Sequence, residues 1–182
     1  MGCVVSGTGT TASGRVADLT GLHYHRHVNI LVVCSGNICR SPMAAVYLQS
    51  RLAAGKAGRT RVDSGGTLGI VGDPAAQAAV AVMRQVCDLD LRPHRSAGLS
   101  REQVEDADAI LVMEGSHRRF IRMLYPSHVS RVRLLSEFAP RGSGVVRGGD
   151  IFDPIGLEPE AFARCFQLMQ TCLDRFVDSL ED

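Results

Sequence analysis

The first feature that could do chemistry is a short turn with a cysteine and an arginine six positions apart, Cys34 and Arg40. The apolar segment 28–33 precedes the turn, and Pro42, a residue favoured in the first turn of a helix, follows it. Backbone N–H groups in such a turn can point inward and bind an anion, and the start of a helix adds partial positive charge. Arg40 would bind two anion oxygens, and the same field would stabilise a thiolate at Cys34. The turn is therefore predicted to bind an oxyanion beside a sulfur nucleophile.

A simpler interpretation of Cys34 is a buried cysteine at the end of a strand, because free cysteines are commonly buried. A pattern of one cysteine and one arginine at this spacing specifies only two residue types, so the spacing alone is weak evidence. The context favours the anion-binding turn. An apolar strand comes before it, Gly36-Asn37 bends it, and Ser41-Pro42 begins a helix.

Apolar runs and helical periodicity alternate along the chain. Strands are predicted at residues 28–33, 61–63, 109–113 and 132–135, and helices at about 42–54, 74–86, 116–124 and 162–180. Gly65-Gly66 is predicted to form a turn, Pro74 to open the second helix and Ser116 to cap the third. Strands that alternate with helices indicate an α/β fold with a parallel sheet. Ligands bind such sheets at the carboxyl ends of the strands, so this rule points to the turns that follow the four strands.

Length and composition fit one domain with a short tail, since the chain has 182 residues, of which 45% are hydrophobic and 21% charged. The net charge of +1 creates no global attraction to nucleic acid or to an anionic membrane. No apolar run in the sequence approaches the ~20 residues of a membrane span. Six cysteines without a Cys-x-x-Cys pair argue against a disulfide scaffold or a zinc ribbon and favour the reducing cytoplasm.

Residues 1–27 are rich in Gly, Ser and Thr and show no clear period, so we predict a flexible leader before a domain that spans 28–182. Met1-Gly2-Cys3 matches the start of a myristoylation pattern, with a cysteine placed for palmitoylation. His23, His25 and His27 alternate, so an extended chain would show them on one face, where they could bind a metal. A solvated leader is the favoured interpretation of both features, because the lipidation pattern is short and a structural zinc needs a fourth ligand in a fixed frame.

Five segments of the chain share a pattern with one known family. They are 32–44 around Cys34, 62–67 (Val-Asp-Ser-Gly-Gly-Thr), 92–96 (Arg-Pro-His-Arg-Ser), 108–113, and 149–154 (Gly-Asp-Ile-Phe-Asp-Pro). Together they resemble the low molecular weight protein tyrosine phosphatases, from about Val28 to Leu180. The resemblance implies a single α/β domain with a four-stranded parallel sheet flanked by helices on both sides, a three-layer arrangement of flavodoxin type. It also implies a cysteine-based hydrolase of phosphorylated proteins that needs no metal or cofactor.

The resemblance implies roles for three catalytic residues and a loop. Cys34 would attack phosphorus and form a phosphocysteine, and Arg40 would bind the equatorial oxygens in the transition state. Asp153 would protonate the leaving oxygen and then deprotonate the attacking water. The phosphate-binding loop would consist of Cys34, Ser35, Gly36, Asn37, Ile38, Cys39, Arg40 and Ser41.

The resemblance also implies supporting roles around the loop. Ser41 would donate a hydrogen bond to the Cys34 thiolate, and Asn37 and His94 would brace the loop. Cys39 would close a reversible disulfide with Cys34 under oxidant and shield the nucleophile. Glu114 stands where an ion pair to Arg40 can form. Of the remaining cysteines, Cys87, Cys165 and Cys172 fall on apolar helix faces and are interpreted as packing residues.

Two departures from the family pattern bear on the substrate. Where relatives commonly carry a Trp, this chain has Leu68-Gly69-Ile70, and where a Tyr commonly follows the Asp-Pro pair it has Ile155. A phosphotyrosine ring would lose stacking partners worth about 0.5–1.5 kcal/mol each. Ile38 favours phosphotyrosine, because the sister enzymes that hydrolyse phosphoarginine usually have Thr at that position. A protein arginine phosphatase therefore stays as the alternative.

Two further functions are disfavoured. Arsenate reduction on this fold needs a cysteine just after the third strand, and residues 113–115 contain none. A phosphoresidue-binding module that has lost turnover would lack the nucleophile, the arginine or the acid, and all three are present. A phosphorylated protein is the expected partner, with no nucleic acid and no stable membrane insertion, and the sequence leaves the oligomeric state open.

Overall fold

The computed structural model describes residues 28–54 and 60–181. The leader at 1–27, with its lipidation pattern and alternating histidines, lies outside the described residues, so those interpretations stay predictions. Within the described residues no helix is long and apolar enough to cross a membrane.

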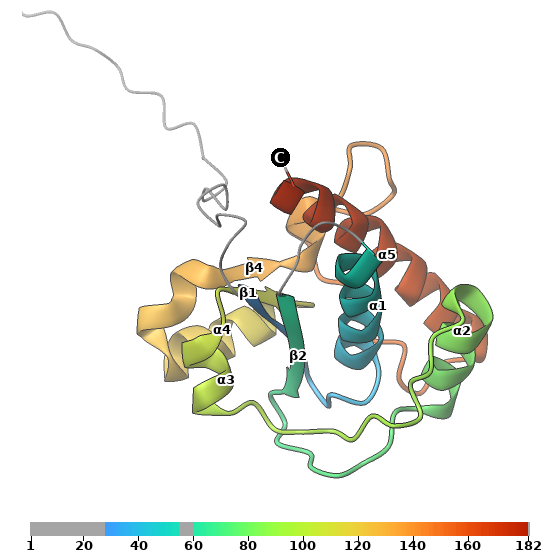
Figure 1. Cartoon of the computed structure of the whole chain (residues 1–182), viewed down its shortest axis with the longest axis horizontal. Coiled ribbons are helices and arrows are strands. Elements are labelled where there is room, and N and C mark those ends of the chain that lie inside the picture. Colours follow the sequence, from blue (N-terminus) through green and yellow to red (C-terminus); the bar gives the residue numbers. More distant parts are fainter. Residues whose placement is uncertain (1–27, 55–59, 182) are drawn as a thin grey trace, which may run out of the picture.

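The centre of the fold is a four-stranded parallel sheet (Figure 1). Its strands, in the spatial order β2-β1-β3-β4, are β1 (Val28–Cys34), β2 (Thr60–Gly66), β3 (Ala109–Val112) and β4 (Val132–Leu134). The last five residues of β1 and all of β3 are buried, as expected for strands covered on both faces. Parallel pairing brings the carboxyl ends of β1, β2 and β3 to one edge of the sheet, where Cys34 pairs with Gly66.

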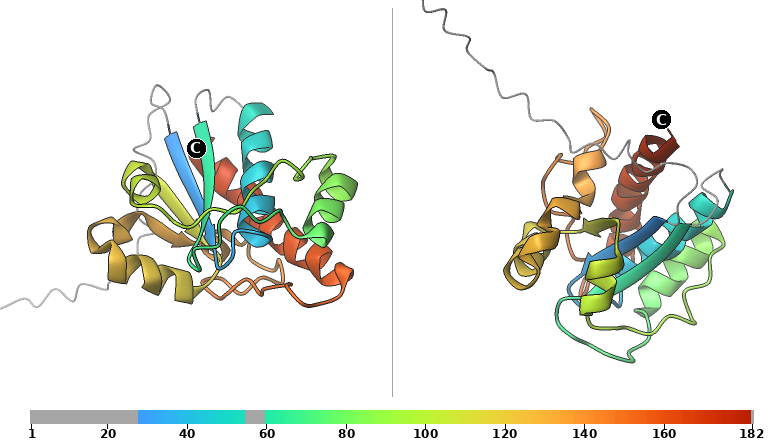
Figure 2. Two further views of the ribbon diagram at one scale, coloured as in Figure 1. Left: turned by 90° about the horizontal axis from the view of Figure 1, so that it is seen from below. Right: turned by 60° about the vertical axis from the view of Figure 1, so that its left-hand side comes forward.

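Helices cover both faces of the sheet (Figures 1 and 2). The helices on one side are α1 (Arg40–Ala54), α2 (Gln77–Cys87) and α5 (Pro159–Glu181), and those on the other are α3 (Arg101–Asp106) and α4 (Gly115–Leu124). Two short 3-10 helices flank β4, at Pro126–Arg131 and Leu135–Phe138. The predicted fold class is confirmed, because alternating helices and parallel strands form three layers.

The alternation of side chains along β1 divides the core into two clusters. Ile30 and Val32 pack with the cluster of α1, α2 and α5, whereas Leu31 and Val33 pack with that of α3 and α4. On the first side α1 and α5 lie side by side (Figure 2), and the hydroxyl of Tyr47 donates a hydrogen bond of 2.7 Å to Asp174. The apolar side chains that recur along α5 are buried in this cluster, namely Phe162, Phe166, Met169, Leu173 and Phe176.

Three local predictions were wrong. Gly65-Gly66 continues β2 instead of turning, because Gly66 packs directly against the loop that follows β1. Helix α2 begins at Gln77 rather than Pro74, since Pro74 pairs in an isolated bridge with Arg95. Ser116 does not cap α4; it lies inside the helix, and its hydroxyl donates to Glu114 at 2.9 Å.

Helix α3 was absent from the prediction, although the sequence carries a signal for it. Ser100 and Gln103 form a capping box, in which the Ser100 hydroxyl accepts from the Gln103 N–H at 3.1 Å and the Gln103 side chain accepts from the Ser100 N–H at 3.1 Å. The helix has only six residues, and a single buried apolar side chain, Val104, gives it no visible period.

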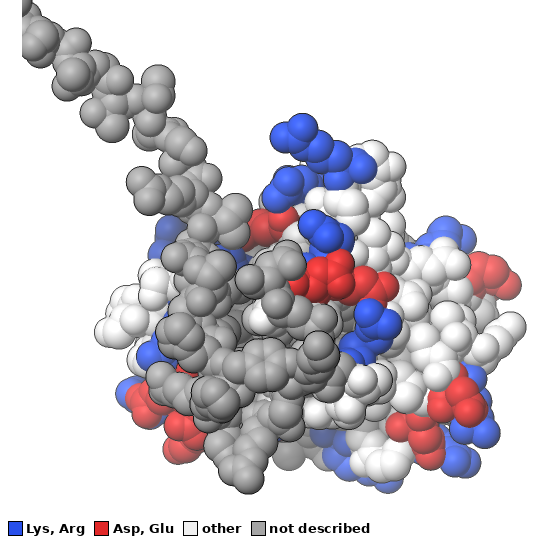
Figure 3. Space-filling model, turned by 45° about the horizontal axis from the view of Figure 1, so that its top comes forward, with Lys and Arg blue, Asp and Glu red and all other residues white. Residues whose placement is uncertain are grey.

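The described surface in Figure 3 carries Lys and Arg as well as Asp and Glu side chains. Their mixture matches a chain with 20 basic and 19 acidic residues. The electrostatic character of the site must therefore come from local groups rather than from the whole molecule.

Candidate active site

The turn predicted to carry the chemistry connects the end of β1 to the start of α1. Cys34 is the last residue of the strand and Arg40 is the first of the 15-residue helix, so the sulfur lies close to the positive end of the helix. The backbone N–H of Asn37 donates to Cys34 Sγ at 3.3 Å, and Ser41 Oγ lies 3.0 Å from the same sulfur. Both groups can donate a hydrogen bond to the sulfur, which suits a nucleophile held at this position.

Asn37 holds the shape of the loop. It adopts the left-handed conformation (φ 54°), which few residues other than glycine and asparagine tolerate. Its side-chain amide donates to Ser41 Oγ and Ser64 Oγ, both at 2.9 Å, and its side-chain oxygen accepts from the Ala97 N–H at 2.9 Å. Because Ser41 Oγ accepts from Asn37, the Ser41 hydroxyl keeps its own proton for the sulfur of Cys34.

His94 contacts the same loop from a distant segment, with Nε2 at 2.7 Å from the Asn37 carbonyl oxygen. The predicted contact of His94 with the loop is therefore present. Ser64 was not singled out from the sequence. The available signal was the position of Ser64, a polar residue two positions before the end of β2, which neighbours the loop.

Gly66 lets β2 approach the loop. A Cβ atom on Gly66 would lie 2.8 Å from the Ser35 carbonyl oxygen and 3.0 Å from the Gly36 carbonyl carbon, both backbone atoms that cannot swing away. Thr67 N and Leu68 N then donate to the carbonyls of Cys34 and Ser35, at 3.0 and 2.9 Å. The loop thus lies against the backbone of β2 and the residues that follow it.

The guanidinium of Arg40 is almost completely buried, at 1% exposure, and is held by groups from two other loops. Its NH1 donates to Glu114 and to the Ile151 carbonyl at 2.9 Å, and its NH2 forms an ion pair with Asp153. Among the described residues Arg40 Nε has no hydrogen-bond partner, which leaves this N–H for an anion. Burial lowers the pKa of Arg40, but the Glu114 hydrogen bond and the Asp153 charge outweigh it and raise the pKa overall, so the group stays charged.

The loop at 149–156 brings the predicted acid to this cluster. The Ile151 N–H donates to the Met113 carbonyl at 2.8 Å, and the Asp150 carboxylate accepts from the Gly115 N–H at the start of α4 at 2.7 Å. These contacts place Asp153 against Arg40 while 39% of its side chain stays exposed. Cys34 and Arg40 are close in the sequence, whereas Asp153 is far from both. All three lie at the edge of the sheet that the strand order predicts.

The other thiols near the site are protonated under ordinary conditions. Burial raises the pKa of Cys39 well above its usual range, and the neighbouring Cys165 and Asp153 add to the effect. Burial likewise raises the pKa of Cys165, whose thiol donates to the Phe152 carbonyl at 3.4 Å, to about 12. All five described cysteines are free thiols, so the disulfide between Cys34 and Cys39 stays a prediction.

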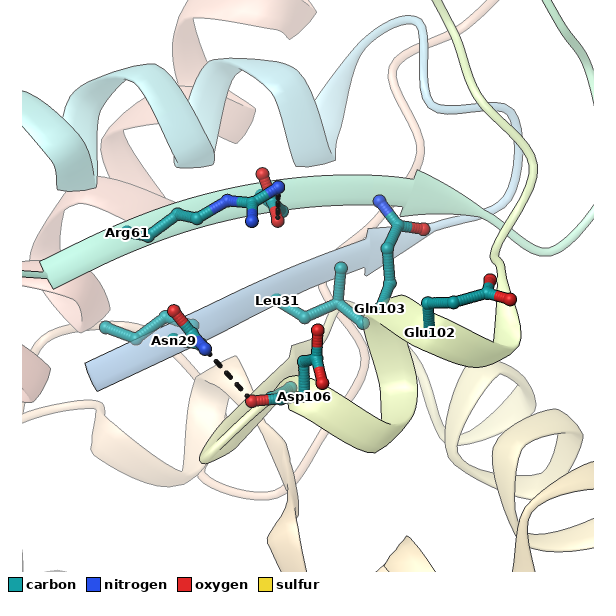
Figure 4. Close-up of a pocket in the computed structure, with 9 residues that line it drawn as sticks. Asn29, Leu31, Arg61, Glu102, Gln103 and Asp106 are labelled. Carbon is teal, nitrogen blue, oxygen red and sulfur yellow. Dashed lines mark hydrogen bonds and ion pairs between the residues drawn. The ribbon is translucent and has the colours of Figure 1, made fainter. Parts of the chain in front are cut away.

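No group of three or more histidine, cysteine, aspartate or glutamate side chains among the described residues could hold a metal ion. A separate cavity of about 210 Å³ opens between α3, β1 and β2, with the side chains of Asn29, Arg61 and Asp106 at its wall (Figure 4). None of its lining residues belongs to the loop 34–41, so this cavity is distinct from the site.

The sequence of residues 29–182 matches the low molecular weight phosphotyrosine protein phosphatases. The chain belongs to this family. It is 37% identical over 148 residues to a probable low molecular weight protein-tyrosine-phosphatase, EpsP, of Ralstonia solanacearum. The aligned region covers 81% of this chain and 92% of that protein. It is 32% identical over 152 residues to the protein-arginine-phosphatase of Geobacillus stearothermophilus, and the aligned region covers 84% of this chain and 95% of that protein.

Solved structures of this phosphatase family have the same fold. The low molecular weight protein tyrosine phosphatase from T. tengcongensis superimposes with a TM-score of 0.74 at 30% identity, over 83% of this chain and 98% of that one. The YwlE arginine phosphatase from Geobacillus stearothermophilus gives 0.73 at 30% identity, over 85% and 93%. The predicted family and its enzyme class, a phosphatase that acts on phosphorylated proteins, are therefore confirmed.

Proposed function

We propose that this phosphatase hydrolyses phosphotyrosine in proteins through a phosphocysteine on Cys34. The observation that carries the proposal is the meeting of three groups: a sulfur with two hydrogen-bond contacts, a buried guanidinium with Nε unpartnered among the described residues, and a half-exposed carboxylate on that guanidinium. A nucleophile, an anion binder and a proton carrier are what an in-line displacement at phosphorus needs.

In the first step Cys34 Sγ forms a bond to phosphorus while the bond from phosphorus to the ester oxygen breaks. Asp153, released from Arg40 by the incoming dianion and protonated, donates its proton to the departing oxygen. Arg40 and the loop N–H groups stabilise the charge on the equatorial oxygens. In the second step Asp153 takes a proton from water, the water oxygen bonds to phosphorus, and the S–P bond breaks. The Ser41 hydroxyl stabilises the sulfur that leaves.

Two observations bear on the phosphorylated side chain. A Cβ on Gly36 would lie 3.4 Å from Ile38 Cγ1 and 3.5 Å from Ile70 Cδ1, so both isoleucines pack close to the loop. Leu68 and Ile155 expose 68% and 45% of their surfaces near the two loops that flank the site. Aliphatic side chains accept the face of a ring by dispersion, and the β-branched Ile38 favours the tyrosine assignment.

Protein arginine phosphatase is the second candidate, supported by the 32% identity to the Geobacillus protein-arginine-phosphatase. The two are separated by initial rates on matched phosphotyrosine and phosphoarginine peptides, with Ile38→Thr as the paired variant. We expect the natural chain to prefer phosphotyrosine and Ile38→Thr to move the ratio toward phosphoarginine. A wild-type preference for phosphoarginine would overturn the substrate assignment and leave the phosphocysteine chemistry intact.

The chemistry itself is tested with p-nitrophenyl phosphate. Cys34→Ser should abolish turnover, because serine oxygen is not ionised in this site, while inorganic phosphate still binds. Cys87→Ser, at a half-buried cysteine on α2, is the control that should keep the wild-type rate. Turnover that survives in Cys34→Ser would contradict the proposal, and binding without turnover in the wild type would favour a phosphoresidue-binding module.

We also propose a cytoplasmic location, in keeping with five described thiols that are free.

A further inference from the structure

One buried histidine in contact with the loop has no part in the chemistry described so far. His117 lies in the first turn of α4, with 2% of its surface exposed. Its Nε2 is 3.0 Å from Ser35 Oγ, the side chain that follows the nucleophile. Among the described residues its Nδ1 has no hydrogen-bond partner. A buried polar ring with half of its capacity unused is costly if its only purpose is packing.

Ser35 connects this histidine to Arg40. The hydroxyl of Ser35 accepts from Arg40 NH2 at 3.4 Å as well as contacting His117. The other protein group on NH2 is Asp153, which must leave when it acts on the substrate. Once Asp153 has moved, Ser35 is the protein group that still holds the NH2 side of the guanidinium among the described residues, while Glu114 and the Ile151 carbonyl hold NH1.

The protons can be assigned along this chain. Burial lowers the pKa of His117, so the ring is neutral near pH 7, with one donor nitrogen and one acceptor nitrogen. An unpartnered buried N–H is rarer than an unpartnered acceptor, which favours hydrogen on Nε2 and the lone pair on Nδ1. The Nε2–H then donates to Ser35 Oγ, which accepts from His117 and Arg40 at once. Ser35 is thereby fixed between the two side chains.

We propose that His117 is a positioning residue that holds Ser35 and, through it, the guanidinium of Arg40 while the phosphoryl group occupies the site. This inference rests on the proposed function for its catalytic consequence, but its direct consequence is the affinity for a bare anion. Loss of the contact would let the NH2 side of Arg40 move when Asp153 is displaced, and both anion binding and transition-state stabilisation would weaken.

The test compares His117→Leu, which fills the space without a hydrogen bond, with His117→Gln, whose amide can reach the same hydroxyl. Ser35→Ala and the double variant Ser35→Ala/His117→Leu complete a double-mutant cycle. For each protein we would measure kcat and KM for p-nitrophenyl phosphate, and the dissociation constant of inorganic phosphate by calorimetry. His128→Leu, at a histidine on the 3-10 helix Pro126–Arg131 with an unpartnered Nδ1 among the described residues, is the matched control.

The expected result for His117→Leu and for Ser35→Ala is about tenfold weaker phosphate binding and about tenfold lower kcat/KM, the scale of one hydrogen bond to a charged network. The double variant should lose no more than either single one, and His117→Gln should recover most of the loss. Wild-type values in His117→Leu, or losses in the double variant that multiply, would overturn the inference. If His117→Leu does not fold, Ser35→Ala and His117→Gln still decide it. Absence of wild-type turnover would contradict the proposed function, whereas the phosphate affinities would still test His117.

Discussion

The buried guanidinium of Arg40 forms an ion pair with the half-exposed carboxylate of Asp153, 113 positions later in the chain. In this ion pair the proposed acid neutralises the proposed anion binder. We expect a phosphate dianion to compete for the same NH2 group and to displace the carboxylate, which would place Asp153 beside the newly bound group. Substrate binding and delivery of the acid would then be a single exchange of partners on Arg40.

The exchange predicts opposite effects of Asp153→Asn on turnover and on binding. Loss of the acid should slow hydrolysis of aryl phosphates by roughly 10²–10⁴-fold. Inorganic phosphate should bind at least as tightly as to wild type, because Arg40 no longer has a carboxylate as competitor. Both are measured by steady-state kinetics with phosphate as inhibitor, and Asp178→Asn, in an exposed ion pair on α5, is the control. Unchanged hydrolysis would remove Asp153 from the mechanism.

The left-handed backbone of Asn37 predicts that two substitutions differ in stability. Asn37→Ala loses three side-chain hydrogen bonds and also strains a φ of 54°, whereas Asn37→Gly loses only the bonds. We expect both to lower the free energy of unfolding and turnover, with the alanine variant about 1 kcal/mol less stable than the glycine variant.

The matched control for Asn37 is Asp88, which has the same φ of 54° at the end of α2. Asp88→Ala and Asp88→Gly should differ in urea unfolding by a similar amount and leave turnover at the wild-type level. Equal stability of the two Asn37 variants would contradict the assigned backbone strain.

Gly66 predicts a steric effect transmitted through backbone. Gly66→Ala places a methyl group 2.8 Å from the Ser35 carbonyl, so the loop must shift, and we expect a loss of about 1–3 kcal/mol in stability together with a fall in kcat. Gly65→Ala is the comparison, because its nearest contact, at 3.3 Å, is the end of the flexible Leu99 side chain. Similar kinetics for the two variants would show that β2 does not shape the loop.

The buried cysteines of α5 predict a loss of stability in alkali. Burial raises the pKa of Cys172 from the ordinary 9.0 to about 11. The folded chain keeps this proton longer than the unfolded chain, so the stabilising effect is complete below pH 9 and is lost as the pH rises toward 11. Between pH 8.5 and 10.5 the unfolding free energy of Cys172→Ala should fall by about 2 kcal/mol less than that of wild type. Urea unfolding measures both proteins at the two pH values. An equal fall in the unfolding free energies of wild type and Cys172→Ala would contradict this prediction.

The parts of the site that are local in sequence could be predicted from it. The loop from Cys34 to Arg40 lies between one strand and one helix, so the strand pattern and Pro42 were enough to place both ends. Asp153 could be placed only through the family resemblance and the rule that strand ends meet at one edge. The Glu114 ion pair follows from the same edge, since Glu114 lies two positions after the end of β3.

The remaining contacts depend on packing that no local pattern encodes. The course of β2 through Gly66 is set by the approach of the loop, whereas two consecutive glycines by themselves favour a turn. Ser116 has the residue type of a cap, but the helix begins earlier because Asp150 accepts from Gly115 N. His117 carries no sequence signal for Ser35, because 82 positions separate them.

Alkylation with iodoacetate tests most directly whether Cys34 is a reactive nucleophile inside an anion-binding loop. At pH 7 we expect Cys34 to be modified first, with complete loss of activity, and inorganic phosphate to protect it. Cys165 and Cys172 should stay unmodified in the folded chain, because burial raises their pKa values to about 12 and about 11. Slow modification of Cys34 that phosphate does not affect would contradict the account.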